Sequence, residues 1–145
     1  MQKFIVSRDD SIYEAFPDVA FAKDGRLVCV FTECEHHGNR NSSRLVVKIS
    51  ADRGRSWSEK YPVTERGTNS AFFDCARLSL LSDGRLAMVC NFVERGGGKT
   101  RYANYLWFSD DGVNWGVPVE LPLGGIVPDR LVELKSGRWV FASHN

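Results

Sequence analysis

Hydrophobic and polar residues alternate in short runs along the whole chain, and clusters of turn residues separate the runs. Residues 26–32 are almost unbroken in apolar and β-branched side chains, which is typical of a strand buried on both faces. Residues 102–108 instead alternate between two faces, with an aromatic ring on each. No segment shows the 3.6-residue apolar period of a helix. The pattern therefore predicts an all-β fold.

Three predicted hairpin turns each contain a glycine, at Gly25, Gly84 and Gly137. These glycines are 59 and 53 residues apart. Each turn joins two predicted strands, which cover residues 19–22 and 26–32, 73–81 and 85–94, and 127–131 and 138–142. Recurrence at this interval indicates a repeat protein, with two full repeats and the beginning of a third.

Shorter elements complete the first two repeats. Residues 61–64 are predicted to form an edge strand, where Pro62 is tolerated because it donates no ladder hydrogen bond. The other expected elements are a polar loop over residues 33–43, a strand over 44–49, a glycine-rich loop over 95–99, a closing strand over 117–121 and a short strand over 4–7.

A second recurring element is the turn Ser50–Trp57, which reads Ser-x-Asp-x-Gly-x-x-Trp. Asp52 is short enough to accept hydrogen bonds from backbone N–H groups two or three residues further on. Gly54 adopts a positive φ without a Cβ clash, and Trp57 is expected to bury its ring beneath the hairpin. A shorter copy spans Ser109–Trp115, and the two tryptophans are 58 residues apart.

This element resembles the Asp-box, or BNR repeat, of sialidases and their relatives, where it joins the third and fourth strands of β-propeller blades. The resemblance implies a partial β-propeller: about two and a half four-stranded antiparallel blades of a six-bladed fold, forming one domain over residues 1–145. The implied blades cover residues 16–64 and 72–121, with a partial blade over 126–145 and a strand of a closing blade over 3–7.

Two and a half blades do not make a closed ring, because propellers close with about four to eight blades. An open stack leaves apolar faces and strand edges exposed, which favours association. We therefore expect either the remainder of a longer chain or a homodimer whose two halves close a six-bladed ring.

Composition excludes several partner classes. The 19 basic and 18 acidic residues give a formal net charge of +1, with no basic stripe for nucleic acid. The amino-terminal residues have no long apolar run, so we expect no signal peptide, and no stretch is apolar enough to span a membrane. Its four cysteines form no Cys-x-x-Cys pair, so we expect reduced, mostly buried thiols and a cytoplasmic location: Cys29, Cys34, Cys75 and Cys90.

In a propeller the innermost strands begin near the central axis, where ligands bind. The charged residues at these starts are Asp18, Asp74, Arg77, Asp129 and Arg130. Two interpretations are open: the aspartates and arginines neutralise one another, or the arginines clamp a substrate carboxylate with their planar forks. In the second case Asp18 and Asp74 are candidate catalytic groups, and the others are substrate-binding candidates.

The resemblance to sialidases implies three substrate-binding arginines, an Asp acid/base and a Tyr nucleophile assisted by a Glu. The first arginine of that family lies in an Arg-Ile-Pro motif, and Ala15 stands in its place here. The family's acid/base loop corresponds to residues 33–40, which contain no Asp.

Four residues of this loop are candidates instead. Glu35 and His36 are suited to proton transfer, and Glu33 and His37 to substrate binding. A plain solvated loop is another interpretation. A metal site is a third interpretation, since Cys, Glu and His are all ligands, but adjacent histidines without a second spaced pair do not by themselves predict one. No cofactor is expected. His144, at a strand end, is a candidate for the rim of the same face.

These features favour a sialidase-like protein that hydrolyses or binds a carbohydrate on its axial face. The alternative is a non-catalytic half-propeller that assembles into a homo-oligomer.

Overall fold

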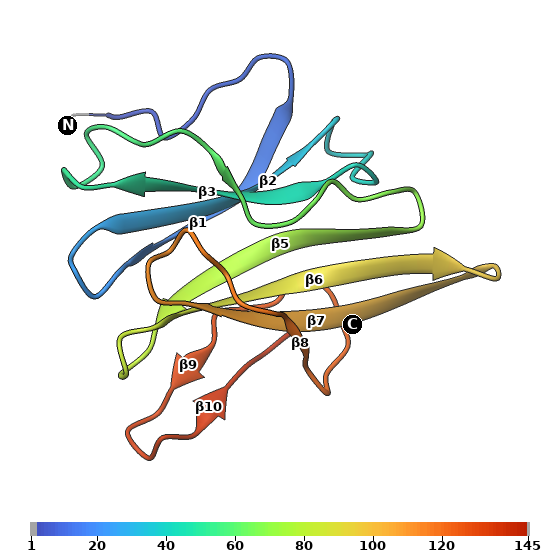
Figure 1. The fold of residues 1–145 in the computed structure, drawn as a ribbon. Helices are drawn as coiled ribbons and strands as arrows, with labels where there is room; N and C mark the ends of the chain where they lie inside the picture. Colours follow the sequence, from blue (N-terminus) through green and yellow to red (C-terminus); the bar gives the residue numbers. More distant parts are fainter. Residues whose placement is uncertain (1–2, 145) are drawn as a thin grey trace.

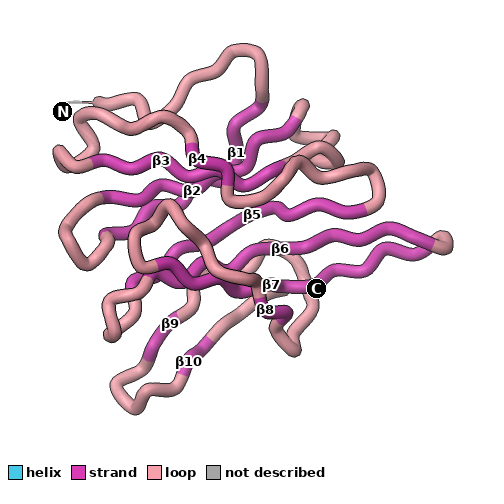
Figure 2. The backbone as a smooth tube through the Cα atoms, in the orientation of Figure 1, coloured by secondary structure: helices cyan, strands magenta, loops and turns pink. Residues whose placement is uncertain are grey.

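The computed structural model describes residues 3–144, and these residues form an all-β fold without helices, as predicted (Figures 1 and 2). Two four-stranded antiparallel sheets and one two-stranded hairpin follow each other along the chain. The first sheet consists of β1 (Tyr13–Phe21), β2 (Leu27–Cys34), β3 (Arg44–Ser50) and β4 (Tyr61–Pro62). The second consists of β5 (Ala71–Leu80), β6 (Leu86–Gly96), β7 (Lys99–Ser109) and β8 (Val119–Glu120), and the hairpin of β9 (Val132–Glu133) and β10 (Trp139–Val140).

Within each sheet every strand pairs with the next one in the sequence, so both sheets are simple meanders. The first sheet, the second sheet and the β9–β10 hairpin follow one another across the molecule in Figure 1. Residues 3–144 include no helix with the length and apolar character required to span a bilayer.

The main core lies between the two sheets. Strand β2 contributes Val28 and Val30 to it, while Cys29 and Phe31 face the opposite side of the first sheet and pack with Val6. All four side chains are almost completely buried, which confirms the prediction that this strand is covered on both faces. A second core lies between the second sheet and the hairpin and contains Leu81, Ala87, Val89, Leu106 and Leu131.

Hydrogen bonds to the aspartate hold both Ser-x-Asp turns. The donors lie two and three residues after Asp111, as expected, but four residues after Asp52. In the first, Asp52 accepts from the backbone and side chain of Ser56 at 2.9 and 2.6 Å, and these bonds lower the pKa of Asp52 to about 2. In the second, Asp111 accepts from the N–H groups of Val113 and Asn114 at 2.8 and 2.7 Å, and its pKa is also lowered to about 2. The turn carboxylates therefore fix the loops between the third and fourth strands.

The tryptophans of these turns are half-buried and contact different cores. Trp57 packs on the outer face of the first sheet, and its Nε1 donates to the carbonyl of Gly54 at 3.2 Å. Trp115 packs against the core between the sheets. The second turn is thus part of the contact between the sheets, whereas the first is not.

A residue with positive φ that is not glycine occurs near the start of each repeat. It is Phe16 (53°) in β1, Cys75 (52°) in β5 and Val127 (48°) in the loop before β9. In β1 and β5 this residue lies in a bulge, where the pairing register with the following strand shifts. A positive φ is unfavourable for side chains with a Cβ, so tertiary contacts impose this conformation.

Four sequence-based expectations are corrected. Residues 127–131 form no strand, because Val127 has a positive φ and Pro128 has no N–H to donate, and Val132–Glu133 pairs with β10 instead. Residues 4–7 form no strand, because none of residues 3–144 supplies them with a ladder partner, and Val6 packs into the outer core instead. Residues 95–99 are not a loop: β6 and β7 continue to a two-residue turn at Gly97 and Gly98, both with positive φ. Glu33 lies within β2 rather than in the polar loop.

Candidate functional site

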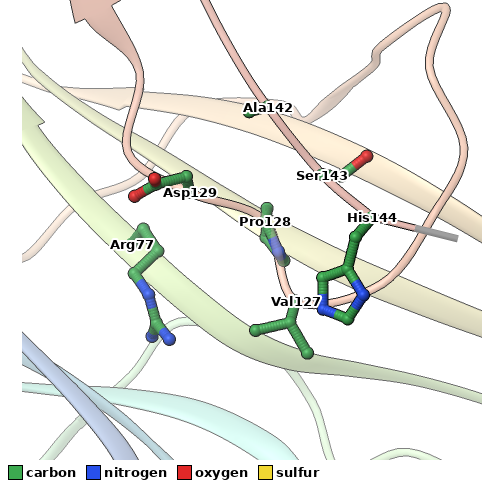
Figure 3. A pocket seen from close by; sticks show the side chains of 7 residues that line it. All are labelled: Arg77, Val127, Pro128, Asp129, Ala142, Ser143 and His144. Carbon is green, nitrogen blue, oxygen red and sulfur yellow. The ribbon is translucent and has the colours of Figure 1, made fainter.

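The side chain two positions after each positive-φ residue is charged in all three repeats: Asp18, Arg77 and Asp129. Strands β1 and β5 contact each other, so the bulges of the first two repeats lie near one another. A cleft of about 350 Å³ opens between β5 and the third repeat (Figure 3). Its lining residues are Arg77, Val127, Pro128, Asp129, Ala142, Ser143 and His144.

Arg77 is the cation of this cleft. Its Nη1 donates to the carbonyl of Ala76 at 3.0 Å, and no carboxylate among residues 3–144 forms an ion pair with it. In Figure 3 Val127 lies between the side chains of Arg77 and His144. Asp129 is exposed and accepts only a backbone hydrogen bond, from Arg130 at 2.8 Å, among the described residues. The cleft therefore presents a guanidinium, a carboxylate and an imidazole.

Asp18 and Arg130, two predicted site residues, pair with each other. Arg130 Nη2 donates to Asp18 Oδ1, and the second oxygen of Asp18 accepts from the N–H of Leu78 at 2.8 Å. Asp18 is therefore engaged by both later repeats. Of the two interpretations given above, this pair therefore fits the one in which aspartates and arginines neutralise one another.

Asp74 is buried, with 2% of its surface exposed. It accepts from Arg40 Nη1 at 2.6 Å, from the hydroxyl of Thr32 at 3.2 Å and from the N–H of Cys75 at 2.8 Å. The guanidinium of Arg40 also lies 5.7 Å from the ring centre of Phe16. Sequence analysis gave Arg40 no role, since only the fold brings its loop over β5.

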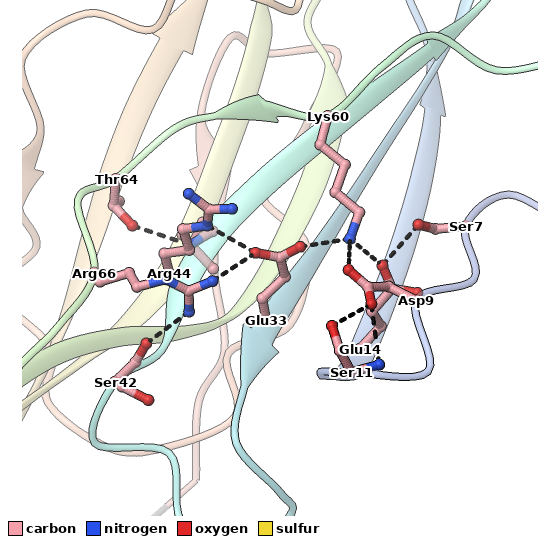
Figure 4. Close-up of polar contacts among 11 residues, drawn as sticks. Ser7, Asp9, Ser11, Glu14, Glu33, Ser42, Arg44, Lys60, Thr64 and Arg66 are labelled. Carbon is pink, nitrogen blue, oxygen red and sulfur yellow. Dashed lines mark hydrogen bonds and ion pairs between the residues drawn. The ribbon is translucent and has the colours of Figure 1, made fainter.

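Glu33 is also 2% exposed and lies in a cluster of cations (Figure 4). Arg44 and Arg66 donate to its Oε2 at 2.7 and 3.3 Å, and Lys60 donates to its Oε1 at 2.6 Å. Burial acts to raise the pKa of Glu33, but the hydrogen bonds from Lys60 and Arg44 prevail and hold that pKa below its ordinary value. Both oxygens are engaged, so this carboxylate joins the strands of the first sheet.

The remaining candidates, Glu35, His36 and His37, are exposed on the β2–β3 loop and do not line the cleft. Glu35 accepts from Asn39 at 2.6 Å, and His36 Nδ1 accepts from the N–H of Gly38 at 3.1 Å. The ring of His37 lies 5.9 Å from that of Phe16. No group of three or more potential metal ligands comes together within residues 3–144.

The structure thus brings together Arg77, Asp129 and His144, and separates them from the loop residues. Val127, Pro128, Ala142 and Ser143 complete the cleft. Sequence analysis did not single these four out, because no polar pattern marks them. The positive φ of Val127 is equally invisible in the sequence, since no glycine stands there.

The four cysteines are free and buried, as predicted. Burial raises the pKa of Cys29 to about 11 and that of Cys75 to about 12. These thiols are therefore protonated and unsuited to nucleophilic chemistry.

No family model matches the chain, and no curated protein matches it. The chain is similar to a solved protein of unknown function from Dyadobacter fermentans DSM 18053, with a TM-score of 0.72 and 20% sequence identity. The similarity covers 94% of this chain and 48% of that one, so the chain spans about half the length of this neighbour. At this identity the likeness is one of fold.

Proposed function

We propose that the two sheets and the hairpin are successive blades of a sialidase-like β-propeller, and that the cleft around Arg77 binds a carboxylated glycan at its axial face. Three observations support the ring. A positive-φ residue recurs near the start of each repeat, the Ser-x-Asp turn joins the third and fourth strands in both sheets, and Arg130 of the third repeat reaches Asp18 of the first.

The observation that carries the glycan proposal is Arg77, a cleft arginine without a carboxylate partner in the described chain. A guanidinium donates two parallel hydrogen bonds to a carboxylate, a geometry that suits a uronic or sialic acid. Asp129 and Ser143, on the opposite wall, offer acceptors for sugar hydroxyl groups, because the Ser143 hydroxyl already donates to the carbonyl of Gly124 at 2.6 Å and its oxygen remains able to accept.

Binding is favoured over hydrolysis because the carboxylates near the cleft are occupied. Glycoside hydrolases use two carboxyl groups on either side of the scissile bond. Here Asp18 pairs with Arg130 and Asp74 with Arg40, which leaves Asp129 as the carboxylate of the cleft lining. Glu35 and His36, the loop candidates for proton transfer, do not line it.

The test is calorimetric titration with a glucuronate-containing disaccharide and with its methyl ester, which lacks the negative charge. The acid is expected to bind at least tenfold more tightly, since a charged hydrogen bond contributes about 1.5–3 kcal/mol. Arg77→Ala is expected to remove the preference for the acid. Arg55→Ala removes the same charge from an exposed turn and is expected to leave that preference unchanged.

Equal binding of acid and ester, or unchanged binding by Arg77→Ala, would overturn the proposal. A panel of chromogenic glycosides addresses the alternative activity: turnover that Asp129→Asn abolishes would replace binding by hydrolysis as the function of the cleft.

A further inference from the structure

The β9–β10 hairpin repeats the side-chain pattern with which each sheet contacts the repeat that follows it. In the sheets, the side chains three, five and seven residues after the hairpin glycine face the next repeat: Val28, Val30 and Thr32 after Gly25, and Ala87, Val89 and Asn91 after Gly84. The same offsets from Gly137 give Val140, Ala142 and His144. We call these three residues the tail face.

The tail face is exposed where its counterparts are covered. Val28 and Ala87, the counterparts of Val140, are 0% and 1% exposed, whereas Val140 is 48% exposed. Val132, on the strand paired with β10, is 51% exposed. Apolar side chains at a position that both sheets bury indicate a surface shaped for a further repeat.

The first sheet lies at the other end of the molecule from the hairpin (Figure 1), and its outer face is complementary to the tail face. Ala76, Leu78, Met88 and Cys90 of the second sheet are buried against the first. Their counterparts 59 positions earlier are Pro17, Val19, Cys29 and Phe31, which we call the head face. Cys29 and Phe31 are covered by Val6 and Trp57, so Pro17 and Val19 form the exposed part of this face. Val19 is 43% exposed, although its counterpart Leu78 has no exposed surface. A groove of about 230 Å³ runs along this face beside Val6.

A hydrogen bond recurs at each junction between repeats. Thr32 Oγ1 accepts from the N–H of Cys75 at 3.3 Å, and Asn91 Oδ1 accepts from the N–H of Val127 at 2.6 Å. Both donors are the positive-φ residues of the next repeat. Phe16 is the positive-φ residue of the first repeat, and no side chain among residues 3–144 accepts from its N–H. His144 occupies the position of Thr32 and Asn91.

We propose that the tail face binds the head face of a second copy of this chain, with a ring nitrogen of His144 accepting from the N–H of Phe16 in that copy. Each copy has one tail and one head, and a copy that spans half of the proposed ring closes it with a second copy through two identical contacts. The solved neighbour, of which this chain spans 48%, has the length for two such sets of repeats. The inference rests on the ring proposed above.

The test is the molar mass of the full chain by light scattering over a hundredfold concentration range around micromolar. The expected mass is twice 16.3 kDa. Val140→Asp places a charge in the tail face and is expected to give the single mass. Val117→Asp is the control, because Val117 is 89% exposed and outside both faces. Equal urea midpoints of the two variants at dilutions where both are monomeric exclude misfolding.

A second pair of variants tests the hydrogen bond. His144→Ala is expected to raise the dimer dissociation constant about fivefold per contact, and so roughly 25-fold for two contacts. His144→Asn copies Asn91 and is expected to restore association.

A monomeric chain throughout the range, or a dimer unaffected by Val140→Asp, would overturn the inference. The two proposals fail separately. A monomer that still binds the uronate through Arg77 would refute the dimer alone. A dimer without uronate binding would refute the cleft alone.

Discussion

Replacing Gly112 by alanine tests the contact between the second Ser-x-Asp turn and the first sheet. A Cβ on Gly112 would lie 2.7 Å from Val28 Cγ2 and 3.3 Å from Leu86 Cδ1. Val28 is completely buried, and its branched side chain has little rotamer freedom, so it cannot move aside cheaply. Overpacking of this kind costs about 1–3 kcal/mol, and the positive φ of 78° adds about 1–2 kcal/mol.

Gly54 provides the matched control. Its N–H donates to the serine of its own turn at 2.8 Å, as the N–H of Gly112 does, and its φ is 84°. A Cβ there would meet Leu27 at 3.5 Å, an ordinary contact distance. Gly54→Ala should therefore cost only the backbone contribution of about 1–2 kcal/mol.

Urea unfolding followed by tryptophan fluorescence measures both free energies. Gly112→Ala is expected to destabilise the protein by about 2–5 kcal/mol, which is about 1–3 kcal/mol more than Gly54→Ala. Equal losses in the two variants would refute the close approach of the second turn to Val28, and with it the described packing of the two sheets.

Two further predictions concern buried and turn carboxylates. Glu33→Gln leaves the surrounding cations without their counter-charge and should lower the free energy of unfolding by roughly 3 kcal/mol; an unchanged urea midpoint would contradict the role assigned to Glu33. Asp52 and Asp111 have folded-state pKa values of about 2 against an ordinary 3.8, so they stabilise the fold above pH 4 and this contribution is lost as the pH falls toward 2. Unfolding curves between these pH values should show the loss, and the double Asp→Asn variant should not.

Local chemistry explains why most of the fold follows from the sequence. Gly25, Gly84 and Gly137 adopt the positive φ that their hairpins require, and the unbroken apolar run of β2 indicates burial on both faces. Asp52 and Asp111 form their turns through neighbours at most four residues away. Such features depend on short stretches of chain, which sequence reasoning can evaluate.

Long-range contacts account for what the sequence could not show. Glu33 was assigned to a polar loop because a carboxylate rarely occupies a buried strand, but residues as distant as Arg66 neutralise it. Arg40 reaches Asp74 only because the fold places the β2–β3 loop of the first sheet next to β5 of the second. The cleft combines Arg77 with His144 across almost half of the chain, and no local pattern encodes that proximity.

The junction hydrogen bonds also imply an order of events during protein synthesis. Thr32 and Asn91, the acceptors, precede Cys75 and Val127, the unfavourable backbone positions that they stabilise. A chain that leaves the ribosome amino-terminus first therefore has each acceptor in place before the residue that needs it emerges. Folding during synthesis should therefore progress from the first sheet toward the hairpin. A circular permutant in which the donors precede their acceptors in the chain should fold more slowly.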